Sequence, residues 1–198
     1  MSPAKILVIP GSLRSESYNV RLAALVTKEL ILADAEATRI SLADYPLPIY
    51  DADLEKSGLP PNARKLKQML CAHAGVFIVS PEYNASITPL LKNAIDWISM
   101  VREPGEPRLA AFQNRAFALA AASSGRSGGR HALLALRQVL AVGCRAFVLG
   151  EQVAVPNAGE AFDDMDQLQD PRTAGELKTL VRRLVEYAHL LQRTERVM

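Results

Sequence analysis

Short, almost wholly apolar runs alternate along the chain with longer segments in which apolar residues recur at helical spacing. The apolar runs cover residues 6–9, 37–40, 75–80, 115–122 and 145–149. The segments with helical spacing cover residues 22–34, 63–73, 91–98, 133–140 and 177–191. Because apolar positions that repeat every three or four residues form one face of a helix, the pattern predicts five strands alternating with five helices.

The apolar runs show little alternation with polar residues, which indicates strands that are buried on both faces. Such strands, separated by helices, are typical of a parallel sheet with helices packed on both sides. The sequence therefore predicts an α/β, three-layer, doubly wound fold, organised as a single domain over residues 1–198. Residues 41–62 hold several prolines and acidic residues and are predicted to form a long surface connection. Thr88 and Pro89 are placed to cap and begin a helix.

Charge and cysteine content exclude several classes of function. The 198 residues include 23 Lys and Arg against 21 Asp and Glu, and a net charge of +2 gives no electrostatic case for a nucleic-acid partner. No apolar run approaches the ~18 residues of a membrane span, so we expect no membrane partner. Cys71 and Cys144 have no metal-binding spacing, and we expect reduced thiols in the core of a cytoplasmic protein.

In a doubly wound sheet, ligands bind where the strands end at their carboxyl edge. The segment after the first predicted strand offers hydroxyl, amide and guanidinium groups at the start of a helix. Its candidate residues are Ser12, Arg14, Ser17, Tyr18 and Asn19. These groups suit a phosphate monoester, which a helix N-terminus binds with few cations. A plain capped helix entry, in which Ser17 or Asn19 is the cap and Arg14 is solvated, is the alternative interpretation.

The segment after the third predicted strand contains Pro81, Glu82, Tyr83 and Asn84. Tyr83 and Asn84 can present an aromatic face and an amide to a planar heterocycle, although plain turn chemistry explains the same residues. Trp97 lies on the helix that follows, and its spacing predicts a core position.

The segment after the fourth predicted strand is rich in glycine and serine, and Ser123, Ser124 and Gly125 begin it. Such a segment allows a flat ligand to approach the backbone closely. Residues 125–129 also match the G-x-S-x-G motif of serine hydrolases, with Ser127 as the nucleophile. Ser127 lies several residues beyond the predicted end of the strand, so a hydrolase is the less favoured hypothesis.

The remaining titratable residues form neither a metal-binding cluster nor an acid–base pair. The aspartates between residues 163 and 170 have irregular spacing and are predicted to form a solvated loop, and His73 and His131 to have structural or solvent roles. A site with phosphate and ring contacts but no nucleophile indicates a bound cofactor that carries the chemistry itself.

Three motifs in order resemble the NADPH-dependent FMN reductase family, and the resemblance extends over about residues 4–150. They are Gly11-Ser12-Leu13-Arg14-Ser15-Glu16-Ser17-Tyr18-Asn19, then Pro81-Glu82-Tyr83-Asn84 with Leu91-Lys92-Asn93-Ala94-Ile95-Asp96-Trp97, and the Gly/Ser segment before Leu136-Arg137-Gln138-Val139-Leu140. The resemblance implies a flavodoxin-like sheet of order 2-1-3-4-5 and an enzyme that reduces quinones, flavins, azo compounds or metal oxyanions. Ala85 departs from the family, which usually has glycine or a polar residue there.

By this resemblance, Ser12, Arg14, Ser17 and Asn19 hold the FMN phosphate, the 81–84 segment lines the isoalloxazine ring, and Ser123, Ser124 and Gly125 close on its other edge. The implied mechanism is ping-pong, with NADPH or NADH as hydride donor and a small molecule as acceptor. The family implies a homodimer or homotetramer, with residues 45–54 and 99–108 as candidate interface or lid segments. A non-enzymatic, flavodoxin-like electron carrier is the alternative. Such carriers tend to be acidic, whereas this chain has a pI of about 8.6.

Overall fold

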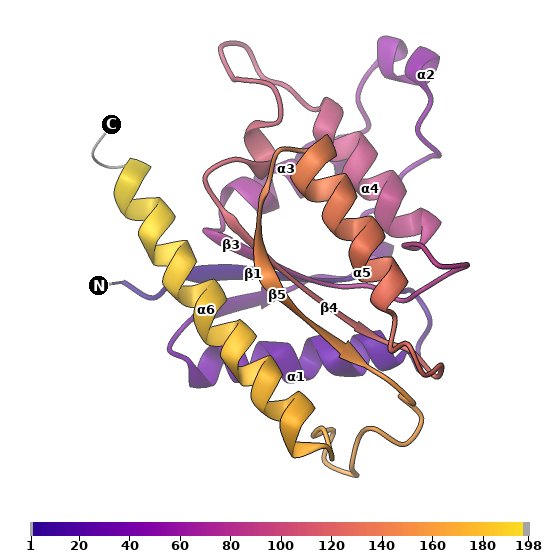
Figure 1. The fold of residues 1–198 in the computed structure, drawn as a ribbon. Helices are drawn as coiled ribbons and strands as arrows, with labels where there is room; N and C mark the ends of the chain where they lie inside the picture. Colours follow the sequence, from indigo (N-terminus) through magenta and orange to yellow (C-terminus); the bar gives the residue numbers. More distant parts are fainter. Residues whose placement is uncertain (1, 196–198) are drawn as a thin grey trace.

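The computed structural model describes residues 2–195 and contains one five-stranded sheet in the order β2-β1-β3-β4-β5 (Figure 1). The strands are β1 (Lys5–Pro10), β2 (Glu36–Arg39), β3 (Gly75–Val79), β4 (Ala116–Ala122) and β5 (Phe147–Val155). Every neighbouring pair runs parallel. The predicted fold class and strand order are confirmed.

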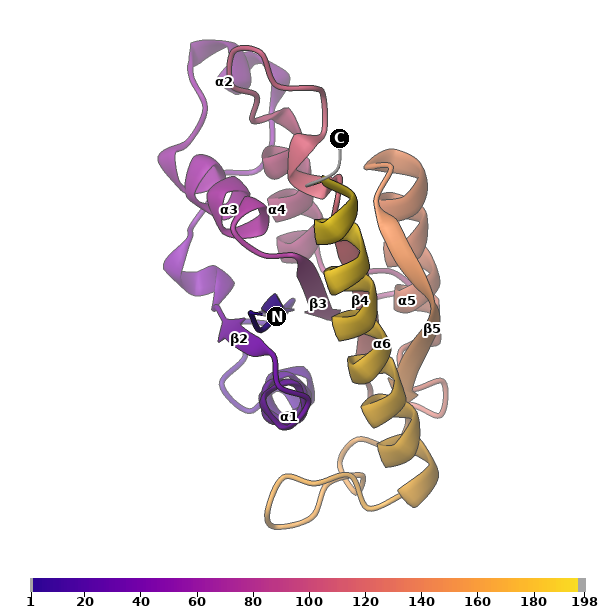
Figure 2. The same cartoon turned by 90° about the vertical axis from the view of Figure 1, so that its left-hand side faces the viewer.

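Helices cover both faces of the sheet, as Figures 1 and 2 show. The α-helices are α1 (Tyr18–Leu32), α2 (Ala52–Ser57), α3 (Pro61–Cys71), α4 (Pro89–Met100), α5 (Arg130–Arg137) and α6 (Pro171–Glu195). The helices α1 and α6 pack on one face of the sheet, and α3, α4 and α5 pack on the other. A short π-helical segment, Gln138–Gly143, extends α5, and 3₁₀ turns lie at Leu42–Asp44 and Ala110–Phe112.

Two apolar cores lie on opposite sides of the sheet because successive side chains of a strand point to opposite faces. Ile6 and Val8 of β1 pack with Leu22 of α1, whereas Leu7 and Ile9 face the other core. All residues of β3 and β4 are buried. Burial on both faces is therefore the reason that these strands are continuously apolar in the sequence.

Strand β5 is longer than the sequence predicts, since it runs to Val155 rather than ending near residue 149. Its register against β4 shifts between Phe117 and Leu119. Arg137 donates hydrogen bonds to the carbonyl oxygens of Leu149 (2.6 Å) and Gly150 (3.3 Å) at this irregularity. Gly150 and the polar residues Glu151 and Gln152 interrupt the apolar pattern here. For this reason the pattern does not predict the second half of the strand.

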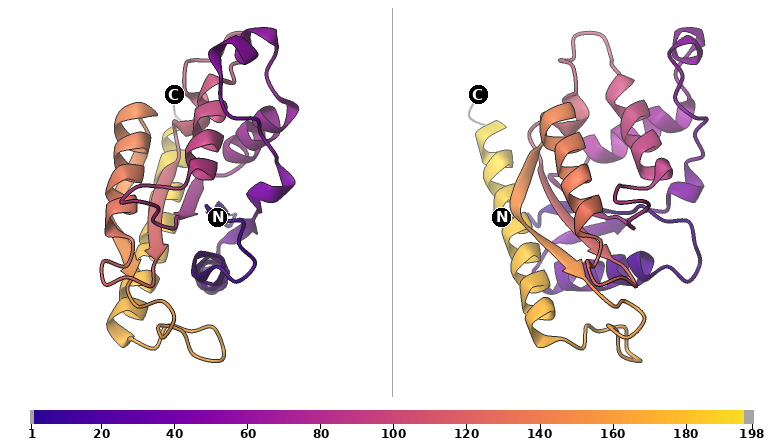
Figure 3. Two further views of the ribbon diagram at one scale, coloured as in Figure 1. Left: turned by 90° about the vertical axis from the view of Figure 1, so that its right-hand side faces the viewer. Right: turned by 45° about the vertical axis from the view of Figure 1, so that its right-hand side comes forward.

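The prolines between residues 41 and 62 enclose a sixth helix that was not predicted. Asp51 caps α2 by accepting hydrogen bonds from the amides of Asp53 and Leu54, and no residue of α2 is buried. The helix projects from one end of the molecule (Figure 3). Helix α2 is therefore stabilised by its cap and not by core packing, so periodic burial gives no signal for it.

The segments 45–54 and 99–108 are both anchored to neighbouring helices. Trp97 of α4 is fully buried, as predicted, and its indole donates a hydrogen bond of 2.7 Å to the carbonyl of Pro48. On the other segment, Arg64 pairs with Glu103 at 2.6 Å, and Lys67 pairs with Glu106. Neither segment is a loose flap in this conformation.

The two cysteines differ in environment, and both are free thiols. Cys144 is buried in the core, but Cys71 is exposed at the end of α3, so the predicted core position of Cys71 is wrong. Within residues 2–195, no helix is long and apolar enough to cross a membrane.

Candidate functional site

The loops that follow β1, β3 and β4 meet around one cleft at the carboxyl edge of the sheet. The cleft has a volume of about 240 Å³ and lies where the strand order reverses, the usual ligand position in such sheets. It is lined by Ser12, Arg14, Ser17, Tyr18, Asn19, Pro81, Glu82, Tyr83, Ala122, Ser123 and Ser124. The sequence predicts all of these residues except Ala122. Two further predicted residues, Asn84 and Gly125, lie in the same loops but outside the lining.

The β1–α1 loop (residues 11–17) presents several unused hydrogen-bond donors. Among the described residues, the backbone amides of Ser12, Leu13, Ser15 and Glu16 have no hydrogen-bond acceptor. Ser17 is buried and caps α1, since its hydroxyl oxygen accepts a bond of 3.3 Å from the amide of Asn19. Free amides at the start of a long helix favour an anion, because the helix dipole adds to their partial positive charge.

Arg14 supplies the cation of this loop. Its side chain is exposed, lies 5.8 Å from the centre of the Tyr18 ring and donates a bond of 3.2 Å to the carbonyl of Glu16. No carboxylate within residues 2–195 forms an ion pair with it. The guanidinium is therefore available to a phosphate, with an aromatic ring limiting the positions it can adopt.

Asn19 was predicted to hold a phosphate, but its amide group has another partner. Its Nδ2 donates to the carbonyl oxygen of Ala122 at 2.8 Å, and its Oδ1 accepts from the amide of Ala122 at 2.9 Å. Both contacts are buried. Asn19 thus joins the start of α1 to the end of β4, and it shapes the cleft by holding two loops together.

The β3–α4 loop (residues 80–88) contains a tight two-residue turn. Tyr83 and Ser86 exchange two backbone hydrogen bonds of 2.9 and 3.0 Å, and the central residues have positive φ angles, 49° at Asn84 and 60° at Ala85. These angles define a left-handed turn of the type that joins hairpins. The amides of Glu82, Asn84 and Ala85 have no acceptor among the described residues and can donate to a planar ligand.

Hydrogen bonds to Gly11 fix the β3–α4 loop to the β1–α1 loop. Gly11 donates from its amide to the carbonyl of Val79 at 2.8 Å, and the Thr88 hydroxyl donates to the carbonyl of Gly11 at 2.8 Å. Thr88 also caps α4 ahead of Pro89, as predicted. A side chain at Gly11 would press on Leu91, because its Cβ would lie 3.2 Å from Leu91 Cδ2. A larger residue at position 11 would require Leu91 to shift by a few tenths of an ångström, so glycine suits the close approach of the two loops.

The β4–α5 loop (residues 123–129) is held against the sheet by two glycines. Both have positive φ angles, 63° at Gly128 and 87° at Gly129, and a Cβ on Gly129 would lie 2.6 Å from that of Ala121. Ser127 lies in this loop, five residues beyond the last residue of β4, Ala122. It is therefore not at a strand-to-helix elbow, and the geometry gives no support to a serine hydrolase.

Glu82 links the second and third loops. Its Oε2 accepts bonds from the amides of His131 (3.0 Å) and Ala132 (3.3 Å), and its Oε1 lies 3.1 Å from His131 Nδ1. The carboxylate thus meets the first turn of α5. The prediction placed Glu82 at the ligand, and the residue does line the cleft, but the carboxylate has a partner within the protein.

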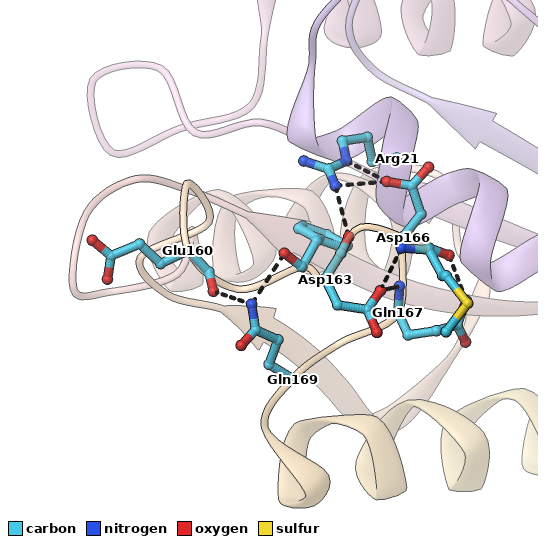
Figure 4. A network of polar contacts seen from close by, with 8 residues as sticks. Arg21, Glu160, Asp163, Asp166, Gln167 and Gln169 are labelled. Carbon is cyan, nitrogen blue, oxygen red and sulfur yellow. Dashed lines mark hydrogen bonds and ion pairs between the residues drawn. The ribbon is translucent and has the colours of Figure 1, made fainter.

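The β5–α6 loop (residues 156–170) folds onto α1 beside the site, outside the lining of the cleft. Arg21 of α1 pairs with Asp166 at 2.6 Å and lies over the ring of Phe162, while Asp163 accepts the amide of Gln167 at 2.8 Å (Figure 4). The loop reaches the site at Gly159, where a Cβ would lie 3.3 Å from the hydroxyl of Tyr18. Asp164, Asp166 and Asp170 are exposed, as predicted, but Asp166 and the backbone of Asp163 also tie this loop to Arg21 of α1. Irregular spacing gave no signal for these tertiary contacts.

The residues present fit an FMN molecule. Free amides, two serine hydroxyls and one guanidinium without an ion pair lie at a helix N-terminus and match the phosphate. Loop amides without an acceptor match the polar edge of a flat ring. No group of three or more potential metal ligands occurs within residues 2–195. A flavodoxin-like sheet with such a cleft at its switch point defines a flavin-binding α/β protein.

The chain belongs to the NADPH-dependent FMN reductase family, whose model matches residues 4–160. It is 37% identical over 169 residues to an NAD(P)H-dependent FMN reductase of Pseudomonas aeruginosa, covering 85% of this chain and 86% of that protein. It is 36% identical over 138 residues to a quinone reductase of Escherichia coli, covering 69% of each. The solved structure of FerB, a flavoenzyme NAD(P)H:(acceptor) oxidoreductase from Paracoccus denitrificans, superposes with a TM-score of 0.77 at 26% identity, covering 94% of this chain and 97% of FerB.

These similarities confirm the predicted family, the enzyme class and the cofactor. The protein is an oxidoreductase that uses FMN and NAD(P)H, and the electron-carrier and hydrolase alternatives are not needed.

Proposed function

We propose that this protein transfers hydride from NAD(P)H to small diffusible acceptors in a ping-pong reaction at the described cleft. The observation that carries the proposal is that three loops meet at one open cleft. No residue of its lining is placed to carry out the chemistry in place of a bound flavin. The titratable residues of the lining are Arg14, Tyr18, Glu82 and Tyr83, and none is placed as a nucleophile. Bound FMN supplies the two-electron chemistry, and donor and acceptor use the same open face in turn.

The phosphate is held by Ser12, Arg14 and Ser17 together with the free amides of the β1–α1 loop. The supporting observation is that the loop amides and the two serine hydroxyls donate to no acceptor among the described residues, while Arg14 donates to the carbonyl of Glu16 and has no ion pair. Asn19 and Tyr18 complete this side, Asn19 by fixing the loop to β4 and Tyr18 by packing beside Arg14.

The isoalloxazine ring lies between the second and third loops. The amides of Glu82, Asn84 and Ala85 supply donors on one side, with Pro81 and Tyr83 as apolar walls. Ser123, Ser124 and Gly125 approach from the other side. Tyr83 is 55% exposed, which leaves an aromatic surface at the mouth of the cleft for a flat donor or acceptor.

Quinones are the acceptor class that we place first. Relatives from Escherichia coli and Pseudomonas putida are named quinone reductases, and one from a Burkholderia species is named 2-hydroxy-1,4-benzoquinone reductase. Flavins, azo compounds and metal oxyanions remain in the proposed range, because the bound flavin and not a side chain of the lining supplies the electrons.

We further propose that the chain acts as one FMN-binding domain in a cytoplasmic homodimer or homotetramer. Helix α6 supports the single domain, because Leu177, Leu180 and Leu184 pack in the same core as β1 and β3. The exposed apolar residues Ile49 and Leu134, 79% and 60% exposed, support self-association. Free thiols and a nucleotide donor of central metabolism support the cytoplasm.

An absorption spectrum of the purified protein, recorded with NADPH and then with NADH, tests the reaction. We expect flavin bands that bleach within seconds of adding the donor and return on adding a benzoquinone. Initial rates over a grid of donor and quinone concentrations should give parallel double-reciprocal lines. Intersecting lines would contradict the ping-pong order. A flavin that neither donor bleaches would favour the electron carrier.

A further inference from the structure

The first turn of α5 lacks any cap of its own. Its N-cap residue, Gly129, has no side chain, and the first two helical residues, Arg130 and His131, are basic. The Arg130 guanidinium at the helix N-terminus faces the positive end of the dipole, so this arrangement is unfavourable on its own. The Arg130 amide donates to the carbonyl of Ser127, but the next two amides, of His131 and Ala132, have no local side-chain acceptor.

Glu82 supplies the acceptor, although it lies 49 residues before His131. One carboxylate oxygen accepts the amides of both His131 and Ala132, and the other meets the imidazole of His131. The Glu82 side chain is only 16% exposed, whereas that of His131 is 57% exposed. The carboxylate is therefore held in place by the amides, and the imidazole is an outer contact.

Both ends of this bridge are rigid. On one side, Glu82 lies between buried Pro81 and the tight turn that begins at Tyr83. On the other side, Gly129 packs against Ala121 of β4 with no room for a side chain. The Glu82 side chain therefore spans the distance between the β3–α4 loop and the first turn of α5, beyond the point where β3 and β4 stop pairing.

We propose that Glu82 is a positioning residue that sets the width of the ring slot by capping α5 with its carboxylate. This inference rests on the proposed placement of the isoalloxazine ring between the two loops. Glu82 acts through α5 and the loop before it. The backbone amide of Glu82 remains free to donate to the ring, while the Glu82 carboxylate accepts from the first amides of α5.

Four variants separate this role from general stabilisation. Glu82→Ala removes the bridge, and Glu82→Gln keeps an oxygen that accepts from the two amides. His131→Ala removes the imidazole and keeps both backbone amides. Asp170→Ala removes a comparable carboxylate cap from α6. There, Asp170 accepts a hydrogen bond of 3.0 Å from the amide of Thr173, and neither residue lines the cleft.

The FMN dissociation constant is measured for each variant by quenching of flavin fluorescence, together with the melting temperature of the apoprotein and the visible circular dichroism of the bound flavin. We expect Glu82→Ala to weaken FMN binding at least tenfold and to change the flavin dichroism. Glu82→Gln should restore affinity to within about threefold. His131→Ala and Asp170→Ala should stay within twofold of the unaltered protein, although Asp170→Ala lowers the melting temperature as much as Glu82→Ala does.

Two results would overturn the inference. If Glu82→Ala leaves affinity and dichroism unchanged, Glu82 is only a helix cap. If His131→Ala weakens binding as much as Glu82→Ala, the imidazole contact and not the amide cap positions the loops. Failure of the proposed function is a separate outcome, because it shows in the unaltered protein as an absence of FMN binding or of bleaching by NAD(P)H.

Discussion

The side chain of Asn19 and the backbone of Ala122 form a closed pair of hydrogen bonds of 2.8 and 2.9 Å across 103 residues of sequence. The pair satisfies the last buried amide and carbonyl of β4 just where the strand ends. It also fixes the start of α1, so the β1–α1 and β4–α5 loops share one junction.

Replacing Asn19 with alanine should lower the free energy of unfolding by about 2–4 kcal/mol, because two buried backbone groups lose their partners. Urea denaturation monitored by circular dichroism measures the loss. FMN affinity should fall with it, since both loops lose their junction. Asn62→Ala serves as the control: Asn62 makes one exposed hydrogen bond to the carbonyl of Pro46, and its loss should cost under about 1 kcal/mol. Equal costs for the two variants would contradict a special role for the Asn19 pair.

Arg14→Ala should weaken FMN binding by about 1–3 kcal/mol, the range for loss of a charge-assisted hydrogen bond. The fold should be unaffected, because the Arg14 side chain is exposed. Fluorescence titration with FMN and with riboflavin measures the effect, and only FMN affinity should change, since riboflavin has no phosphate. Arg172→Ala on α6, whose side chain is 86% exposed, removes the same charge away from the cleft and should leave both affinities unchanged. Equal losses for FMN and riboflavin would contradict the phosphate contact.

Ala85→Gly should stabilise the protein by about 0.5–1 kcal/mol. Ala85 has a φ angle of 60°, and the left-handed conformation costs a residue with a Cβ about 1–2 kcal/mol, which exceeds the entropy that glycine loses on folding. Thermal and urea unfolding measure the difference. Ala24→Gly, within α1, should have the opposite sign and cost about 1 kcal/mol. A destabilised Ala85→Gly protein would show that the alanine methyl makes a contact worth more than the strain.

The sequence was sufficient for the fold because burial on both faces makes β1, β3 and β4 continuously apolar. It also predicted that the three loops lie together, because parallel strands bring their carboxyl ends to one edge. The shared position of Ser12, Ser17 and Ser123 in one cleft could therefore be predicted without any information on tertiary contacts.

The partners of individual side chains could not be predicted in the same way. Asn19 and Glu82 are polar residues in loops at the carboxyl edge of the sheet. From the sequence, a polar side chain that is free to bind a ligand cannot be distinguished from one that is already hydrogen-bonded within the protein. Their partners, Ala122 and the first turn of α5, are backbone groups that carry no side-chain signal at all. Such long-range contacts depend on the assembled sheet, and only coordinates reveal them.

The two thiols should react at very different rates, since Cys71 is exposed and Cys144 is buried. Burial raises the pKa of the Cys144 thiol to about 11, so almost none of it is thiolate at pH 8. An aromatic disulfide reagent at pH 8 should label one thiol in the native protein and two in urea, and Cys71→Ser should show no native labelling. Rapid native labelling of Cys71→Ser would contradict the burial of Cys144.

The raised pKa of Cys144 also makes the free energy of unfolding depend on pH, because the folded state favours the protonated thiol. The contribution of Cys144 to stability is complete below pH 9 and is lost as the pH rises toward 11. Urea denaturation at several pH values measures this loss, and the Cys144→Ala variant should not show it.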